Sequence, residues 1–523
     1  MNEPRVVPEP LGGSPLSRAV QAGDLDRRVF VPAPHSTREW AERVRTVGAD
    51  TNAGWFDRLS DAFGSADRTL DRLQRTARAG GVVVTSGQQA GLFGGPIYTW
   101  SKAIAMLTFA DTLERETGTP VAPVFWAATD DADFAEASRT YVTENGGVVP
   151  LEVSAPPPAG TPMALAPLGD VTPLLATLRR ACGSLAYERA YAAVADAYAG
   201  ETTTLGSAYV RLLRALLEPL GIAVLDSSHP SVRGAGGAVM RAALDGADAV
   251  AEALDERRGW LVARGFEPQV ADVPGLSAVF ILEGGRKRRV PLGEARATAA
   301  TADASLLSPN VLLRPVVERG IVPTVAYVGG PGELAYFAQV SAVAQALGVA
   351  QPIAVPRWSC TIVEPPIARA LARLAVEIDA VRDPTALQAR VARAAVPAEV
   401  RQAMAELRAA VRGGVASVAR RDHEASNSPL LAPAVVEGAA RQLEYRVDRL
   451  ERRLVAAAKR RGNEALRDVQ RAQTALWPGG HRQERTLNFI PLLARYGDAL
   501  WTAMRTSAAA HAERMVTGVA DVG

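Results

Sequence analysis

A glycine-rich segment after residue 85 carries side chains suited to chemistry. Val82 to Thr85 is apolar and β-branched, SGQQAGLFGGP follows it, and Lys102 lies one turn into the next helical stretch. A loop between a strand and a helix exposes backbone N–H groups, and its glycines let an anion approach closely. The segment is neither a GxGxxG nor a P-loop motif. Two interpretations stay open, a phosphate or carboxylate site and a tight structural turn.

An acidic segment follows the next apolar run. The sequence PVFWAATDDADF places Asp130, Asp131 and Asp133 just beyond it. Ligands of open parallel sheets sit beyond the carboxyl ends of the strands, so we expect these carboxylates beside the glycine segment. Grouped carboxylates can bind Mg²⁺, accept a hydrogen bond from an amine or act as a base. The alternative is that Asp130 or Asp131 caps a helix N-terminus.

A second glycine segment repeats the pattern in AYVGGPGELAY at 326–336. Asn310 and Arg314 lie upstream of it, and Arg357 follows another apolar run. Arginine can bind a carboxylate or phosphate through two parallel hydrogen bonds. Two strand, glycine and helix patterns in one sheet favour a ligand site.

Other chemistries are disfavoured. Cys182 and Cys360 belong to no CxxC pair, and we expect Cys360, in the apolar PRWSCTIVE, to be buried. Ser86 lacks the GxSxG elbow of a hydrolase. The histidines are scattered without ligand spacing, so no histidine-based metal site is expected: His35, His229, His423, His481 and His511.

The elements that position these residues form an α/β pattern. We expect a helix over 98–115 and helical, polar residues before position 80. Near-continuous apolar runs are typical of parallel strands covered on both faces. Alternation of such runs with helices predicts a parallel sheet. The runs are 82–85, 122–128, 222–226, 322–327 and 353–355.

Two insertions interrupt this pattern. About ninety residues separate the second and third runs, including the proline-rich 155–167, which indicates a helical insertion. In the second insertion, 277–283 and 286–290 flank Gly284-Gly285, as in a β-hairpin. The basic run Arg286 to Arg289 fits either a solvated arm or an anion site.

The C-terminal part is rich in Ala, Arg, Glu and Leu and favours helices. Apolar residues recur with heptad spacing at 367–378 and 436–457, on either side of 422–433. We expect an antiparallel helical hairpin that packs on itself or forms a dimer. The expected division is 1–150 N-terminal helices and first part of the core, 151–220 helical insertion, 221–255 core, 256–310 second insertion, 311–365 core, 366–475 coiled coil and 476–523 a segment returning to the core.

Composition limits the class of protein. The chain has 523 residues, 48% hydrophobic and 22% charged, with a formal net charge of +2. It is expected to be globular with several structural units. Near-neutral charge gives no general affinity for nucleic acid, and no apolar run is long enough to span a membrane or act as a signal peptide. We therefore expect a cytoplasmic protein with no nucleic-acid or membrane partner.

The two glycine segments, the acidic segment and PRWSCTIVE, together with QERTLNFIPLLARYG, resemble the cysteine ligase family of bacillithiol biosynthesis. The resemblance runs in order from about residue 80 to 497. It implies a Rossmann-like core related to class I nucleotidyltransferases, connecting-peptide insertions and a coiled coil that forms a homodimer. It also implies a ligase that adds cysteine to glucosaminyl malate, with ATP as the expected activator of the carboxylate and Mg²⁺ left open.

The resemblance carries functional residues over by position. Asp131, Asp133 and Lys102 are the expected catalytic residues, and no metal ligands are assigned. The expected substrate- or nucleotide-binding residues are Gln88, Gln89, Gly91, Gly95, Tyr98, Asn310, Arg314, Tyr327, Gly330, Gly332, Glu333, Tyr336, Gln339, Arg357 and Asn488.

One motif departs from the family. Its second motif reads Glu-Asp-His-Asp-Phe followed by Asn-His, and both histidine positions differ here, as Ala132 and Arg139. If either histidine serves the reaction, Asp131 or Asp133 must replace it. The alternative is a diverged member that binds a nucleotide or metabolite without catalysis or uses another acid and amine.

Overall fold

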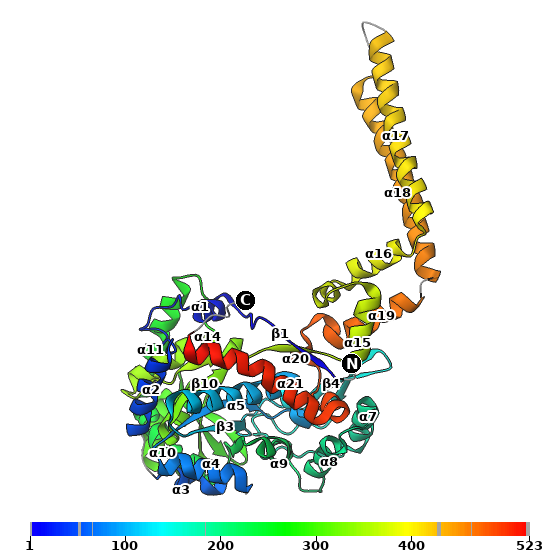
Figure 1. Ribbon diagram of the computed structural model, residues 1–523. Helices are drawn as coiled ribbons and strands as arrows, with labels where there is room; N and C mark the ends of the chain where they lie inside the picture. Colours follow the sequence, from blue (N-terminus) through cyan, green and yellow to red (C-terminus); the bar gives the residue numbers. More distant parts are fainter. Residues whose placement is uncertain are drawn as a thin grey trace. The chain divides into compact units, whose positions relative to one another are not determined.

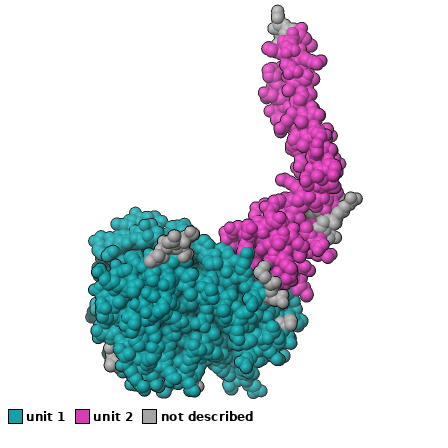
Figure 2. Space-filling view, in the orientation of Figure 1, with its two compact units in different colours: residues 1–144, 148–362, 482–523 teal, residues 145–147, 363–481 magenta. Residues whose placement is uncertain are grey.

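The computed structural model describes residues 3–50, 54–64, 66–183, 185–425, 430–461 and 463–518. The chain divides into two compact units, coloured separately in Figure 2. Unit 1 comprises residues 1–144, 148–362 and 482–523. Unit 2 comprises residues 145–147 and 363–481.

Unit 1 is built on a five-stranded parallel sheet, and all five strands coincide with the apolar runs in the sequence. Its strands in spatial order are β11-β10-β2-β3-β6. Most of their side chains are buried, as expected for strands covered on both faces. The bounds are β2 Val82–Gln89, β3 Val121–Ala128, β6 Ala223–Asp226, β10 Thr324–Gly329 and β11 Ala354–Pro356.

The strand order reverses beside β2. The chain adds β3 and β6 on one side of β2 and then β10 and β11 on the other. Such a reversal opens a crevice at the carboxyl ends of the strands, where α/β proteins bind ligands. Strand β2 is longer than the sequence predicts, because Ser86–Gln89 stays paired in register with Phe125–Ala128. Gln88 and Gln89 therefore end a strand and do not lie in a loop.

Helices cover both faces of the sheet (Figure 1). Val82 and Val84 of β2 face one core with α5, Ile97–Thr117, whereas Val83 faces a second core on the opposite side. The C-terminal helix α21, Ile490–Thr517, packs along α5. Its N-terminal end brings Phe489 to 5.3 Å from Trp100, measured between ring centroids. The helix expected over 98–115 is thus confirmed.

The N-terminal residues are largely helical, as expected. They are less polar than expected, because several of their side chains are buried in the core. Trp40 and Trp55 are buried against the sheet helices and strands. The elements are β1 Arg5–Pro8, α1 Pro15–Ala22, α2 Thr37–Ala49, α3 Trp55–Leu59 and α4 Asp67–Arg78. Strand β1 pairs with β12, Cys360–Val363, in a separate two-stranded sheet, and Cys360 is buried as expected.

The first insertion is helical, as predicted, but a strand pair precedes its helices. The pair is β4, Arg139–Glu144, with β5, Gly147–Glu152. The helices are α7 Thr172–Cys182, α8 Glu188–Ala197 and α9 Leu205–Leu217. The sequence missed the strands because their alternating polar residues break the apolar pattern expected of a buried sheet.

The second insertion contains the predicted hairpin. Strands β7, Leu276–Glu283, and β8, Arg286–Pro291, are antiparallel, with Glu283 opposite Arg286. The turn residues Gly284 and Gly285 both have positive φ, which explains the glycine pair. A three-residue strand β9, Leu307–Pro309, completes the sheet. The remaining helices around the sheet are α10 Pro230–Asp245, α11 Ala247–Val262, α12 Ala295–Thr301, α13 Arg314–Ile321 and α14 Pro331–Ala346.

Unit 2 contains a long antiparallel pair, α17, Ala398–Ala425, and α18, Pro433–Arg461. Ion pairs join the two helices, from Arg408 to Asp448 at 2.8 Å and from Arg412 to Glu444 at 2.7 Å. The structure confirms a helical hairpin that includes α18, the helix that contains the predicted stretch 436–457. Residues 426–429, within the expected connection, lie outside the described residues.

The predicted partner of α18 was wrong. The stretch 367–378 is not one coiled-coil helix, because α15, Pro365–Leu374, ends at Ala375, whose φ is 49°. Helix α15 packs instead against α19, Asn463–Leu476, and Arg373 binds Asp468 at 2.8 Å. A short helix α16, Pro384–Ala394, comes before α17.

No helix in the part of the chain that the structure describes is long and apolar enough to cross a membrane.

Candidate active site

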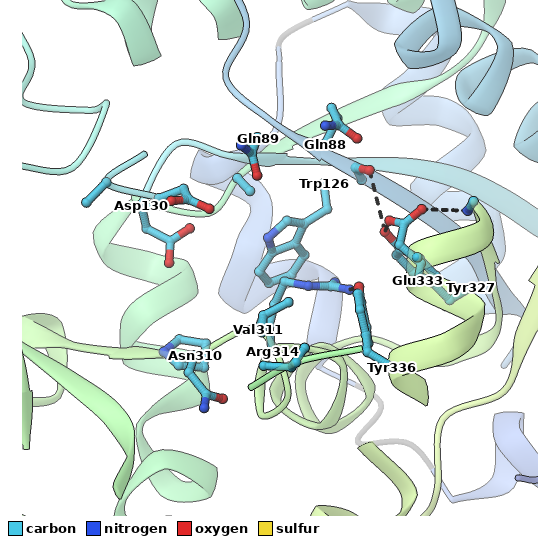
Figure 3. Close-up of a pocket in the computed structure, with 18 of the residues that line it drawn as sticks. Gln88, Gln89, Trp126, Asp130, Asn310, Val311, Arg314, Tyr327, Glu333 and Tyr336 are labelled. Carbon is cyan, nitrogen blue, oxygen red and sulfur yellow. Dashed lines mark hydrogen bonds between the residues drawn. The ribbon is translucent and has the colours of Figure 1, made fainter. Parts of the chain in front are cut away.

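A cavity of about 570 Å³ lies at the carboxyl ends of β2, β3, β10 and β11 in unit 1. Figure 3 shows Asp130 and Asn310 on one side of it, Glu333 and Tyr327 on the other, and Trp126 between them. The cavity collects most of the residues that the sequence indicated. Those lining it are Gln88, Gln89, Tyr98, Lys102, Asp131, Asn310, Arg314, Tyr327, Gly330, Gly332, Glu333, Tyr336 and Arg357.

A buried ion pair between Lys102 and Glu333 lies where the strand order reverses. Lys102 Nζ lies 2.6 Å from Glu333 Oε2, and it also donates to Gln88 Oε1 at 2.8 Å and to the Gly87 carbonyl at 3.0 Å. Glu333 Oε1 accepts a hydrogen bond from the Tyr327 hydroxyl at 2.5 Å. Helix α5 supplies the lysine and helix α14 the glutamate, so the pair fixes both helices at the cavity.

The surroundings determine the charge of this pair. Burial alone would raise the pKa of Glu333, but Lys102 and the Tyr327 hydroxyl hold that pKa below its usual range. Gly330 N–H donates to the same carboxylate at 2.6 Å. Burial lowers the pKa of Lys102, and Glu333 opposes part of that effect. Glu333 therefore stays ionised and keeps the lysine beside it.

The two predicted arginines are held by buried glutamates. Arg314 Nη1 lies 2.6 Å from Glu318 Oε2, and its guanidinium lies 4.8 Å from the centre of the Tyr327 ring. Arg357 donates to both carboxylate oxygens of Glu484, at 2.8 and 2.9 Å. Both Nη groups of Arg357 are thus engaged. Its buried Nε has no hydrogen-bond partner among the described residues, which leaves this N–H for a ligand.

Tyr98, Asn310 and Tyr336 complete this wall. Gln88 Nε2 donates to the Tyr98 hydroxyl at 3.0 Å, and burial raises the pKa of that hydroxyl, so Tyr98 remains protonated. Asn310 Oδ1 accepts from two backbone N–H groups just before α13. The Tyr336 hydroxyl lies 3.5 Å from Arg314. The wall is therefore lined by prepositioned polar groups.

The acidic turn after β3 holds two carboxylates in different environments. Asp130 accepts from Ser227 Oγ at 2.6 Å and lies 3.6 Å from Lys287 Nζ. Burial alone would raise the pKa of Asp130, but Lys287 and Ser227 bring it below its usual value. Burial raises the pKa of Asp131, and the neighbouring Asp130 charge adds to this. Adjacent acids with separated pKa values can take different roles in proton transfer.

Asp133 lies outside the cavity lining. Its Oδ1 accepts from Glu136 N–H at 3.1 Å and caps the short helix α6, Phe134–Ala137. The sequence attributed helix capping to Asp130 or Asp131, and this was wrong, because the helix begins at Phe134 and the residue before it is the cap. The structure gives Asp133 a capping contact and gives Asp131 the place in the cavity.

The first glycine segment closes on itself. The N–H groups of Gly94 and Gly95 donate to carbonyls within the turn, Phe93 N–H donates to the Tyr198 hydroxyl at 2.6 Å, and Ile97 N–H donates to the Leu487 carbonyl at 3.0 Å. Gly91 and Gly95 do not line the cavity. For residues 91–97 of this segment the structure supports the tight turn, whereas Gly87, Gln88 and Gln89 at the end of β2 line the cavity.

Asn488 and Gln339 also serve the scaffold. The buried Asn488 amide donates to the carbonyls of Phe93 and Gly95 at 3.1 and 3.2 Å. Gln339 forms two hydrogen bonds with the backbone of Val270, at 2.9 and 3.0 Å. Neither residue lines the cavity, so the structure does not bring them to the predicted ligand site.

Several lining residues were not among the predicted site residues, although the basic run that contains Lys287 and Arg289 was considered as an anion site. Lys287 and Arg289 come from β8, Phe280 from β7 and Trp126 from β3, and Asp130 was considered only as part of the acidic segment. The period-two alternation of the basic run could have indicated that Lys287 and Arg289 share a face. Nothing local in the sequence marked Glu484 as the partner of Arg357.

The two positions where the family motif has histidine lie in different environments. Ala132 lines the cavity beside Asp131. Arg139 is exposed on β4 and binds Glu152 at 2.7 Å. Only the first departure therefore changes the cavity itself.

The donor set does not fit a metal held by the protein alone. Among the described residues, no three His, Cys, Asp or Glu side chains come together as ligands. We therefore assign no catalytic step to Mg²⁺.

The sheet order, the helices on both faces and the cavity at the strand reversal define a Rossmann-like α/β protein. The chain belongs to the bacillithiol biosynthesis BshC family: residues 27–358 match its N-terminal Rossmann-like domain and residues 360–516 its C-terminal coiled-coil domain. The recognition made from the sequence motifs and the expected fold class are both confirmed.

Relatives in several bacteria bear the name "Putative cysteine ligase BshC". The protein of Solibacter usitatus is 33% identical over 438 residues, covering 81% of this chain and 82% of the relative. The protein of Salinibacter ruber is 27% identical and covers 97% of both chains. The protein of Geobacillus thermodenitrificans is 26% identical and covers 87% of both. The similarity therefore extends through both units.

Proposed function

We propose that this protein joins the carboxyl group of cysteine to the amino group of glucosaminyl malate and so forms bacillithiol. The family and the printed names of its relatives support a cysteine ligase. The observation that carries the proposal is one cavity that brings cationic side chains together with Asp131, a carboxylate with a raised pKa.

The reaction requires an activated carboxylate. A free carboxylate does not react readily with an amine, so ATP converts it to an acyl phosphate or acyl adenylate with a phosphate-containing leaving group. Arg314 and the free Nε of Arg357 line the end of the cavity that suits these anions. The three donors of Lys102 are occupied by Glu333, Gln88 and the Gly87 carbonyl, so Lys102 contributes by balancing the Glu333 charge at this end. The first-turn N–H groups of α14 at Gly332 and Glu333 lie at the same end and add anion donors.

Asp131 is the base in this scheme. The amine nitrogen attacks the activated carbonyl carbon, the bond to the phosphate leaving group breaks, and the amine loses a proton to Asp131. A base with a raised pKa transfers protons more effectively near neutral pH than an ordinary aspartate. Asp131 adjoins Ala132, one of the positions where the family motif carries histidine, and thus takes over a proton-accepting role there.

The test measures product by mass spectrometry in a mixture of purified protein, cysteine, ATP and glucosaminyl malate. Asp131→Asn keeps the shape but cannot accept the proton, so turnover falls by roughly 10²- to 10⁴-fold with the fold intact. Asp133→Asn is the matched control, because Asp133 lies outside the cavity lining. Equal turnover of wild type and Asp131→Asn would remove Asp131 from the mechanism.

The same assignment predicts the thiols of the source cell. Deletion of the gene removes bacillithiol and leaves glucosaminyl malate to accumulate, and a plasmid copy of the wild type restores the thiol. Unchanged thiol pools in the deletion strain would contradict the proposed substrates.

The alanine at position 132 favours a second candidate function. Because it removes a family side chain from the cavity, a diverged protein that binds a nucleotide or metabolite without catalysis, or joins another acid and amine, fits the same geometry. Calorimetric titration with ATP and glucosaminyl malate separates the candidates. Tight binding without product from the full substrate mixture would support the second one.

We also propose that the protein is cytoplasmic and forms a homodimer through α17 and α18. Apolar side chains remain exposed on the hairpin, among them Leu443 at 45% and Tyr445 at 59% of their full exposure. Exposed apolar rows on a long helix pair are typical of coiled-coil interfaces. Light scattering should give twice the chain mass, and Leu443→Lys should reduce it to one chain.

A further inference from the structure

The basic run on β8 divides between two faces of the hairpin. Arg286 and Arg288 are exposed, and Arg288 forms ion pairs with Glu283 and Glu294 at 3.0 Å. Lys287 and Arg289 alternate with them and line the cavity. Successive side chains of a strand point to opposite faces, so the hairpin directs half of its positive charge into the site.

Lys287 is held in the cavity by the acidic turn. Its side chain is only 8% exposed, and Nζ donates to the Asp130 carbonyl at 2.8 Å. Nζ also lies 4.6 Å from the centre of the Phe280 ring, which shields one side of the ammonium group. An ammonium group has three donors, and these contacts leave capacity for a ligand anion.

Arg289 is positioned through one edge of its guanidinium. Its Nε donates to the Ser277 carbonyl at 2.6 Å, which ties the arginine to the neighbouring strand β7. The half-buried side chain lines the cavity. Burial lowers the pKa of Arg289, and the Asp272 carboxylate opposes part of that effect. The Nη groups are therefore the part of Arg289 that can bind a ligand in the cavity.

The hairpin is fixed in place by the first insertion. Lys287 N–H donates to the Gly160 carbonyl at 2.8 Å, within the proline-rich segment. That segment in turn donates from Met163 N–H to the Asp131 carbonyl at 2.8 Å. The acidic turn, the proline-rich segment and the hairpin thus form one connected wall, which makes Lys287 and Arg289 prepositioned donors.

A further donor in the same cavity lacks a partner. Trp126 is 3% exposed and lines the cavity, and its indole Nε1 has no hydrogen-bond partner among the described residues. Figure 3 shows its ring between Asp130 and Glu333. A buried N–H without an acceptor is costly, and a ligand oxygen in the cavity would satisfy it.

We propose that Lys287 and Arg289 form an anion subsite that binds the dicarboxylate end of the amine substrate. This inference rests on the proposed function and deepens it. Cations on alternate residues of one strand suit two carboxylates on adjacent carbons. The subsite adjoins Asp131, which must reach the amine of the same molecule, whereas Arg314 and the Nε of Arg357 serve the phosphate groups at the opposite end.

The shared chemistry is an anionic oxygen group, which a dicarboxylate or a nucleotide phosphate could supply. Binding to the full-length protein is measured by calorimetry with L-malate and, separately, with ATP. Loss of one charge-assisted pair should weaken malate binding by roughly 10- to 100-fold in Lys287→Met and in Arg289→Met, with ATP binding unchanged. Arg286→Met and Arg288→Met are the matched controls on the outer face and should bind malate as the wild type does.

Three results would overturn the dicarboxylate subsite: weakened ATP binding alone, equal malate binding in all four variants, and no malate binding to the wild type. Because Lys287→Met leaves Asp130 without its cation, Lys287→Arg and Arg289→Gln provide variants that disturb the fold less, and circular dichroism checks each one. The binding measurement does not depend on turnover. Malate binding that depends on Lys287 in a protein without ligase activity would keep the subsite and reject the proposed function.

Discussion

The two glycine turns at the carboxyl edge of the sheet look alike in the chain but differ in what surrounds them. The turn after β2 directs its N–H groups into its own carbonyls, the Tyr198 hydroxyl and the Leu487 carbonyl. The turn after β10 places Gly330 and Gly332 in the cavity and carries Glu333 to Lys102. A strand, glycines and a helix therefore create a backbone site only where no other segment satisfies the exposed groups.

The difference comes from distant segments. Asn488 and Tyr198 approach the first turn from the C-terminal segment and the first insertion, so its donors and acceptors are occupied. The second turn has its own capping contact, between Glu333 and Gly330 N–H, and needs no distant partner. The first turn is a scaffold element and the second a part of the site, and four variants test this contrast.

The largest effect is expected from Asn488→Ala. The variant leaves the buried carbonyls of Phe93 and Gly95 without this donor, and it removes the acceptor of Ile490 N–H. The free energy of unfolding should fall by roughly 3–5 kcal/mol, as urea denaturation would show. The affinity of the remaining folded protein for ATP should be nearly unchanged. A stable Asn488→Ala with weak ATP binding would place the first turn in the site.

Gly95→Ala should come next. Gly95 has φ 72° and ψ −167°, a backbone conformation that essentially only glycine adopts. We expect a loss of about 1–3 kcal/mol in unfolding free energy, measured in the same way. Gly80→Ala is a suitable reference, because Gly80 also has a positive φ but has open space around its Cα. Similar losses in both variants would mean that a positive φ alone sets the cost, and that neither the ψ of Gly95 nor its contact with Thr99 adds to it.

A smaller effect, dependent on pH, is expected from Glu333→Gln. The pKa of Glu333 is lowered in the folded protein, so its stabilising contribution is present above its unfolded pKa of about 4.3 and is lost as pH falls through the folded value. Thermal unfolding between pH 6 and about 3 should therefore show a weaker loss of stability with acid in Glu333→Gln than in the wild type. Asn488→Ala should keep the wild-type dependence on pH, and parallel curves for all three proteins would contradict the Glu333 assignment.

The smallest change in stability should come from Gly332→Ala. A Cβ at Gly332 would meet only the Gln269 amide at 3.8 Å, an ordinary van der Waals contact, and its φ is not positive. We expect unfolding free energy within about 0.5 kcal/mol of the wild type. Because Gly332 lines the cavity, the KM for ATP should rise while stability stays constant. A destabilised variant with an unchanged KM would make this turn a scaffold element too.

The sheet could be predicted because each strand is buried on both faces. Short, β-branched apolar runs such as Val82 to Val84 favour strands that are covered on both faces, and these residues are fully buried. The extension of β2 through Gln89 could not be predicted, since it depends on pairing with β3. The end of α15 and the helix that packs against α18 could not be predicted either. The heptad pattern of one helix does not specify which other helix covers it.

Site residues were predicted correctly where the position of a residue in its own helix or strand is enough to direct its side chain into the cavity. Lys102 and Glu333 lie near the starts of the helices that follow β2 and β10, Arg314 begins α13 after β9, and all three reach the cavity. Asn488 and Gln339 were conspicuous in motifs but serve packing, which residue type alone does not distinguish. Lys287 was hidden in a basic run whose two faces become different only when the hairpin meets the Gly160 segment.

The order of the chain has a consequence for synthesis on the ribosome. Glu484 and Asn488 complete the surroundings of Arg357 and the first glycine turn, yet they follow all of residues 363–481 in the sequence. A nascent chain that has already emerged through β11 therefore exposes the side of α5 that α21 later covers, and an unpaired Arg357, while the long helical hairpin is still being translated. Since domains generally fold as units during synthesis, this unit must wait for a late segment, and chaperone binding should be strongest in that interval.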